Sequence, residues 1–296
     1  MTTEEPGGAS SASGDERSPT GPDDGRVPPG PDGYPVVGSL VEYAGDPFDF
    51  EREVHREYGD VVSKLLDARD EAGHGMTDRQ VRDEMMTLLL AGHETTALAL
   101  TSTFFLLAQH GDVEATLVAE LDRELDGEPP TVADVGDLPY LERVVKESMR
   151  LYPPVPGIVR EPVEDDEIGG YHVPAGVTVG MSQHVVHRDP RWYDDPMAFR
   201  PERWTDEFER SLPRLAYFPF AAGPRRCIGD RFAMLEARLV LATILQEYHL
   251  ELVSSPSLDL RPSITARPRN PVWMQVHERD GTQWEAAEME AEASAD

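Results

Sequence analysis

The sequence FAAGPRRCIG, residues 220–229, contains Cys227, which is the only cysteine of the chain. A helical pattern follows it directly, from Asp230 to Tyr248. Gly223 and Gly229 allow the backbone to turn tightly and to approach another group closely. A helix N-terminus and two neighbouring arginines favour the thiolate, the form of cysteine that ligates metals and acts as a nucleophile. A single cysteine also excludes a disulfide framework, an all-cysteine zinc site and a fused iron–sulfur domain.

Three further short motifs precede this stretch. In ESMR, residues 147–150, an acid and a base are spaced by three, so both lie on one helix face and can pair. That spacing is common in helices, and alone it is more typical of a surface pair. The other two motifs are PERW at residues 201–204 and AGHETT at residues 91–96.

The pattern Phe-x-x-Gly-x-Arg-x-Cys-x-Gly resembles the haem-binding loop of the cytochrome P450 family, in which the cysteine thiolate is the axial iron ligand. ESMR resembles the Glu-x-x-Arg of that family's helix K, PERW its Pro-Glu-Arg-Phe segment, and AGHETT the oxygen-binding groove of helix I. All four stand in the family's order, so the chain is identified as a member over about residues 34–277. The resemblance implies a mainly α fold with a minor β part.

The resemblance also implies roles for the reactive residues. Cys227 would ligate the iron of haem (iron protoporphyrin IX), and its electron density would favour O–O cleavage. Glu94 and Thr95 would form the acid–alcohol pair that supplies protons for oxygen activation. Val155–Ile158 would line the pocket for a small apolar organic substrate.

Other matching residues would hold the cofactor or its loop. Glu147, Arg150 and Arg203 would form a charged network that locks the haem loop. The expected cofactor-binding residues comprise propionate partners, loop residues and small residues that leave room for dioxygen: Arg160, Arg225, Phe220, Gly223, Gly229, Ala91 and Gly92. We expect His93, His184 and His187 to pack or to donate and accept hydrogen bonds rather than to ligate a metal.

A large block of the family pattern is missing after about residue 62. Val61-Val62 leads directly into Lys64–Asp67, which resembles the approach to helix I. We therefore expect an incomplete cytochrome P450 fold that retains an N-terminal entry, helices I to L, the haem loop and small β-hairpins, without helices B to H. The missing lid would let water reach the iron, and helix I would expose apolar surface.

Periodicity and turn signals predict the elements of the body. One helical pattern runs from Leu65 to His110, with Thr77 as a cap, and its apolar centre favours burial in a protein core over a membrane span. Pro153 ends a later helix. Further helices are predicted over 113–125, 138–152 and 230–248, hairpins over 155–181, an ordered loop over 182–219 and a strand over 272–277.

The two ends differ in composition from the body. Residues 1–33 and 278–296 are acidic and rich in small residues, and we expect both to be disordered tails. Between them, the expected cytochrome P450 domain consists of an N-terminal piece, 34–62, and a main part, 63–277.

The charge is strongly negative. The chain has 56 acidic and 27 basic residues and a net charge of −29, which argues against nucleic-acid binding and docking on anionic lipid. Only Lys64 and Lys146 are lysines. An acidic, lysine-poor surface fits a salt-rich cytoplasm, where screening weakens self-repulsion. We therefore expect a cytoplasmic protein without a membrane anchor, from a halophilic organism.

Electrons for the expected reaction must come from a separate protein. No Gly-x-Gly-x-x-Gly motif follows a predicted strand, so no nicotinamide or flavin domain is expected. The electrons would come from NAD(P)H through a reductase and an acidic ferredoxin-type donor. The donor would dock on a local basic cluster: Arg225, Arg226, Arg231 and Arg238.

The sequence leaves three functions open. The first is a haem-thiolate monooxygenase that inserts one oxygen atom of O2 into an apolar substrate. The second is a remnant or haem-binding module without monooxygenase activity. The third is a hydrolase with Cys227 as nucleophile and a histidine as base, which the surrounding loop sequence disfavours.

Overall fold

A computed structural model describes residues 64–65, 67–70, 73–261 and 263–279. All of them fall in the larger of two compact units, residues 33–296, while the smaller unit, residues 1–32, lies outside the described part. The predicted N-terminal tail and N-terminal piece, 1–62, and all of the predicted C-terminal tail after Arg279 also lie outside it. The described chain is mainly helical with small antiparallel sheets.

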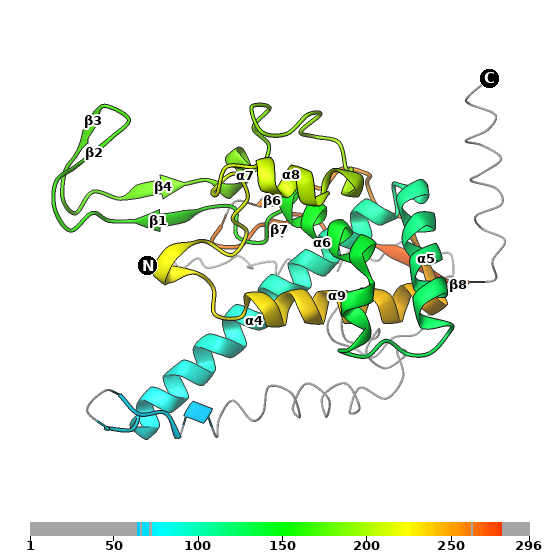
Figure 1. Cartoon of the computed structure of the whole chain (residues 1–296), viewed down its shortest axis with the longest axis horizontal. Coiled ribbons are helices and arrows are strands. Elements are labelled where there is room, and N and C mark those ends of the chain that lie inside the picture. The colour runs from blue at the N-terminus through cyan, green and yellow to red at the C-terminus, as the bar shows by residue number, and fades with distance from the viewer. Residues whose placement is uncertain (1–63, 66, 71–72, 262, 280–296) are drawn as a thin grey trace, which may run out of the picture. The chain divides into compact units, whose positions relative to one another are not determined.

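Four long helices form the core of the described part (Figure 1). They are α4 (Asp78–Leu107), α5 (Gly111–Leu125), α6 (Pro139–Leu151) and α9 (Asp230–Glu247). The last three agree with the predicted helices to within two residues at each end. Their buried faces share one apolar cluster that includes Leu117, Leu141 and Leu241.

Helix α4 begins later than predicted. Thr77 caps it, as expected: its hydroxyl accepts from the Gln80 N–H (3.3 Å), and its own N–H donates to the Gln80 side chain (2.9 Å). The prediction of one helical pattern from Leu65 is wrong, because the chain turns at Gly73, whose φ of 81° is left-handed.

The burial of α4 changes along its length. From Ser102 to Leu107 every side chain is buried, whereas all eight residues of 86–93 are exposed. Leu89 and Leu90 are 62% and 67% exposed although the surrounding sequence is apolar. The expected burial in a protein core therefore holds for the second half of α4, and the expected exposure of apolar surface is seen in its first half, which extends beyond the other helices in Figure 1. Within the described residues, no helix combines the length and apolar character that spanning a membrane requires.

Short strands pair in four two-stranded antiparallel sheets within the described residues. The hairpins predicted over 155–181 are present as two of these pairs, and the predicted C-terminal strand pairs with the strand after α9. The pairs are β1 (Ile158–Arg160) with β4 (Val179–Met181), β2 (Asp166–Ile168) with β3 (Tyr171–Val173), β5 (Tyr248–Leu252) with β8 (Met274–Glu278), and β6 (Leu260–Arg261) with β7 (Arg267–Pro268).

The segment predicted as an ordered loop contains short helices as well. They are α7 (Gln183–Val186), the 3-10 turn η2 (Pro201–Arg203) and α8 (Asp206–Ser211). Ser182 and Thr205 cap the two α-helices through their hydroxyl groups. Helices this short lack the apolar periodicity by which the longer ones were predicted.

Candidate functional site

The loop around Cys227 closes on itself through backbone hydrogen bonds. The Cys227 N–H donates to the Phe220 carbonyl (2.9 Å), and the Arg226 N–H donates to the Gly223 carbonyl (3.1 Å). Gly223, which begins the 3-10 turn η3 (Gly223–Arg225), has a φ of 70°, so glycine is favoured there. The thiol at the end of this closed loop is exposed.

Two details of this loop differ from the sequence expectation. Gly229 has an ordinary φ of −93°, and a Cβ there would lie 4.0 Å from Cys227 Sγ, which is a normal contact. The backbone conformation at 229 therefore does not itself require glycine. Ala221, in contrast, has a left-handed φ of 59°, a strained conformation that sequence inspection missed.

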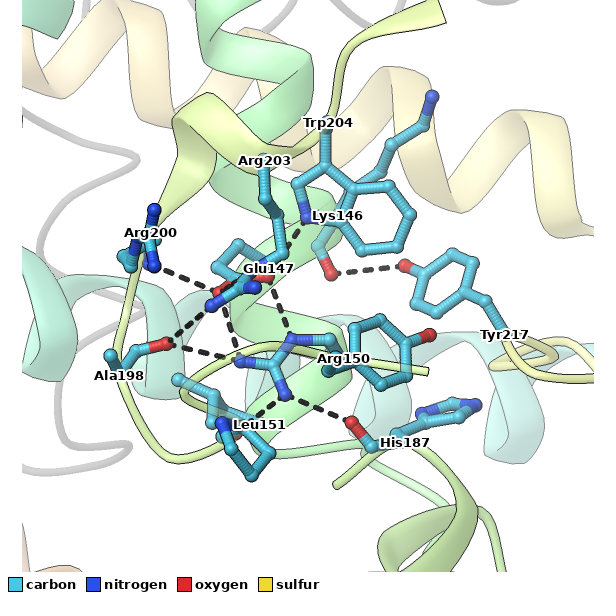
Figure 2. Close-up of polar contacts among 12 residues, drawn as sticks. Lys146, Glu147, Arg150, Leu151, His187, Ala198, Arg200, Arg203, Trp204 and Tyr217 are labelled. Atoms are coloured by element: carbon cyan, nitrogen blue, oxygen red, sulfur yellow. Dashed lines mark hydrogen bonds and ion pairs between the residues drawn. The ribbon is translucent and has the colours of Figure 1, made fainter. Parts of the chain in front are cut away.

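Glu147 lies at the centre of a buried charged network (Figure 2). Arg150 donates two hydrogen bonds to its carboxylate, Nε to Oε2 (2.8 Å) and Nη2 to Oε1 (2.9 Å). Arg203 Nε donates to the same Oε1 at 2.9 Å. Glu147 and Arg150 are fully buried and the Arg203 side chain is 5% exposed, so this is not a surface pair.

Uncharged groups, namely an indole N–H, a backbone N–H and backbone carbonyls, complete this network. Trp204 Nε1 donates to Glu147 Oε2 (2.9 Å), and the Arg200 N–H donates to Oε1 (3.0 Å). Arg150 Nη1 donates to the carbonyls of His187 (2.9 Å) and Pro196 (2.7 Å). From the sequence, Trp204 was only an aromatic substitute for phenylalanine. Its indole N–H supplies a hydrogen bond that phenylalanine cannot make.

The two expected propionate partners, Arg160 and Arg225, line one pocket of about 350 Å³. The first lies in β1 and the second in η3, and Val159 and Glu161 complete the lining. Two guanidinium groups in one pocket suit an anionic group, because each presents a fork of N–H donors.

The expected oxygen groove lies on the exposed part of α4. The Thr95 hydroxyl donates to the Ala91 carbonyl one turn earlier, at 2.7 Å. A Cβ at Gly92 would meet no atom within 4 Å, so the helix surface is open there.

The structure places Glu94 against the C-terminal segment rather than against Thr95. Arg267 Nε donates to its carboxylate at 2.6 Å, and the Thr265 hydroxyl makes a second, short hydrogen bond to the same oxygen. These two contacts lower the pKa of Glu94 to about 2. Glu94 is therefore a paired carboxylate at neutral pH. The sequence carried no signal for this pairing, because the partners are far apart along the chain.

Replacing Arg267 with glutamine should release the pKa of Glu94. The stability that this depressed pKa contributes is present above the ordinary value of about 4.5 and is lost as the pH falls toward 2. Carboxyl carbon NMR should show Glu94 ionised at about pH 3.5 in the parent protein and distinctly more protonated in Arg267→Gln, in which only the Thr265 hydrogen bond still lowers the pKa of Glu94. Arg269→Gln, which removes the partner of Asp259 instead, is the control. An unchanged Glu94 titration in Arg267→Gln would contradict the pairing.

A second pocket, of about 570 Å³, lies beside the cysteine loop. Phe220 and Gly223 line it, together with four basic side chains and one acid: Lys146, Arg214, Arg226, Arg238 and Glu142. Two members of the expected basic cluster are paired, Arg226 with Asp230 and Arg238 with Glu142 (3.2 Å). The lining is nevertheless more basic than acidic, unlike the chain as a whole.

A sequence model of the family described as "Cytochrome P450" matches residues 60–273, well over half of the chain. The chain belongs to the cytochrome P450 family. It is 42% identical to cyclooctatin synthase of Streptomyces melanosporofaciens, over 74% of this chain and 49% of that protein. It is 38% identical to pentalenene oxygenase of Streptomyces avermitilis, over 78% of this chain and 49% of that protein.

Solved cytochrome P450 structures share the fold. The "cytochrome P450DA heme domain" superposes with a TM-score of 0.72 at 34% identity, over 83% of this chain and 55% of that one. Retinoic acid bound cyanobacterial CYP120A1 gives 0.71 at 32% identity, over 81% and 55%. The chain spans about half the length of the curated relatives it matches, so its cytochrome P450 fold is incomplete.

The described residues fit a haem group. An exposed thiol stands on a closed loop, two arginines share one pocket, and the helix surface at Gly92 is open. This donor set matches what haem requires in this family: one sulfur ligand for its iron and basic partners for its two propionates. Family membership lends no support to the hydrolase hypothesis.

Proposed function

We propose that this chain binds haem through the Cys227 thiolate and is a haem-thiolate monooxygenase, inserting one oxygen atom of O2 into a small apolar organic substrate. The observation that carries the proposal is the closed loop that presents Cys227 as an exposed thiol, within a chain of this family. Two relatives, cyclooctat-9-en-7-ol 5-monooxygenase and pentalenene oxygenase, are named for oxygenase reactions.

Each residue has a part in this proposal. Cys227 ligates the iron, while Arg160 and Arg225 bind the two propionates from one pocket. Haem, when bound, supplies the oxygen chemistry. Thr95 holds a proton on its hydroxyl one turn after Ala91, beside the open surface of α4.

The paired state of Glu94 changes its expected part. Its pKa of about 2 keeps it ionised at neutral pH, so it carries no proton and, as a weak base, does not hold one readily. While its carboxylate is paired with Arg267, Glu94 cannot donate a proton. A role in proton supply would require that this ion pair open.

The electrons are supplied from NAD(P)H through a reductase and a ferredoxin-type donor. An acidic donor suits the basic side of the second pocket, where Arg214 and Arg226 lie beside the cysteine loop. Docking on such charges weakens with salt. In the salt-rich cytoplasm that the acidic composition suggests, apolar contact around Leu215 would carry part of the binding.

The alternative is a haem-binding module without turnover. The observation that favours it is the exposure of all residues over 86–93, because a site open on this side admits water. Activated oxygen would then be lost before it reached a substrate.

The carbon monoxide difference spectrum of the dithionite-reduced, haem-supplied protein in molar salt tests the proposal. We expect the strongly red-shifted Soret band of a thiolate-ligated haem, and its loss in Cys227→Ala. Absence of that band in the parent protein would overturn haem-thiolate binding. A normal band without product, when ferredoxin, reductase, NAD(P)H and apolar substrates are added, would select the module instead.

A further inference from the structure

Phe218, just before the cysteine loop, has both backbone polar groups bound by buried side chains. Its N–H donates to His187 Nε2 at 2.9 Å, and its carbonyl accepts from Gln183 Nε2 at 2.5 Å. Gln183 and His187 are both fully buried. The backbone groups of a loop usually form hydrogen bonds with other backbone groups or with water. Two fully buried side chains that both bind the backbone of one residue are therefore unusual.

His187 is itself held from several sides. Its ring lies 5.1 Å from the Tyr217 ring and 5.3 Å from the Phe218 ring, centroid to centroid. Its carbonyl accepts a hydrogen bond from Arg150 Nη1, so the backbone of His187 is bound directly to the Glu147 network in Figure 2. Burial, with help from the charges of Arg150 and Arg188, lowers the pKa of His187 to about 3. The ring is therefore neutral, as an acceptor at Nε2 must be.

The hydrogen bonds continue from Phe218 to the cysteine. The Phe218 carbonyl also accepts from the Ala221 N–H (3.0 Å), which closes the turn with the strained Ala221. The next bond along the loop joins the Phe220 carbonyl to the Cys227 N–H (2.9 Å). A continuous series of contacts thus joins the charged network to the thiol-bearing residue.

We infer that Gln183 and His187 are positioning residues that fix the backbone of the cysteine loop through Phe218 and so set where the Cys227 sulfur stands. The inference rests on the proposed function for its significance, because the position of the sulfur matters to a bound haem. The hydrogen bonds themselves require no cofactor. Neither residue touches the sulfur, so neither is a catalytic residue.

Amide hydrogen exchange in the haem-free protein tests the inference directly. In His187→Leu we expect the amides of Phe218 and Cys227 to exchange at least tenfold faster, while buried amides of α5 keep their rates. His187→Gln retains an acceptor near the position of Nε2 and should restore slow exchange. Gln183→Met, which keeps shape but not the donor, should accelerate the Ala221 and Cys227 amides.

His184→Leu is the matched control, because His184 lies in α7, the helix that ends just before His187, but contacts Arg188 rather than Phe218. It should leave exchange in the loop unchanged. If His187→Leu accelerates every core amide equally, or leaves the Cys227 amide unchanged, the residue has no specific hold on the loop and the inference fails.

The haem-loaded protein gives a second readout. His187→Leu should convert a large share of the red-shifted carbon monoxide band to the unshifted form, and His187→Gln should restore it. A parent protein that binds no haem, combined with the expected exchange result, would refute the proposed function while leaving the hold on the loop established. A normal band in His187→Leu would overturn the claim that this hold sets the sulfur.

Discussion

Glu147→Gln should lower the free energy of unfolding by about 3–5 kcal/mol, the usual cost of removing one partner from a buried charged group. The substitution preserves shape but leaves the positive charges of Arg150 and Arg203 buried without a counter-charge. It also removes a charged acceptor from Trp204 Nε1. Because the network is buried, added salt should not rescue the loss. Denaturant unfolding in molar salt, followed by circular dichroism, measures the effect.

Glu142→Gln is the matched control for this experiment. Glu142 lies on the same helix and also contacts two basic residues, Lys146 (2.8 Å) and Arg238 (3.2 Å). Its side chain is 38% exposed, however, so we expect a loss of only about 1 kcal/mol or less. Equal losses in the two variants would show that burial does not decide the strength of the Glu147 network.

Leu241→Ala should lower the free energy of unfolding by about 2–5 kcal/mol, since it removes a fully buried side chain and leaves a cavity. Leu241 lies in α9 within the main apolar cluster. Leu90→Ala makes the same chemical change on α4, where the side chain is 67% exposed, and should cost less than about 0.5 kcal/mol. Thermal and denaturant unfolding of both variants give the comparison.

The Leu90 control also tests the exposure of α4. Helices that are apolar on all sides are normally buried, so an exposed one promotes association. If Leu90→Ala destabilises the protein as much as Leu241→Ala, then α4 is covered in solution, and the described exposure of residues 86–93 is wrong. If the cost is small, the apolar turns of α4 face solvent as described.

Local signals predicted much of the fold. The 3.6-residue periodicity gave α5, α6 and α9, Thr77 gave the start of α4, and Pro153 gave the end of α6, because each acts within one or two turns. The left-handed turn at Gly73 was missed, since a glycine does not by itself reveal its φ. The exposure of the first half of α4 was only partly foreseen, because burial depends on what packs alongside.

Motifs predicted the residues of the site better than their contacts. The family resemblance predicted a network of Glu147, Arg150 and Arg203, and the structure shows the hydrogen bonds between their side chains. It gave no sign that Glu94 pairs with Arg267 or that His187 binds Phe218, since these contacts join distant segments and follow no periodic pattern. Such long-range polar contacts depend on tertiary packing.

The charged network of Glu147 has a consequence for the evolution of this chain. Within the part of the chain that the structure describes, every hydrogen bond of its three charged side chains ends on a residue between 147 and 204. A gene rearrangement with breakpoints outside that interval therefore keeps all partners of the network together and leaves no buried charge without its counter-charge. Loss of the flanking sequence uncovers apolar helix surface, which association can hide, whereas a breakpoint inside the interval would leave an ion in the core with nothing to neutralise it.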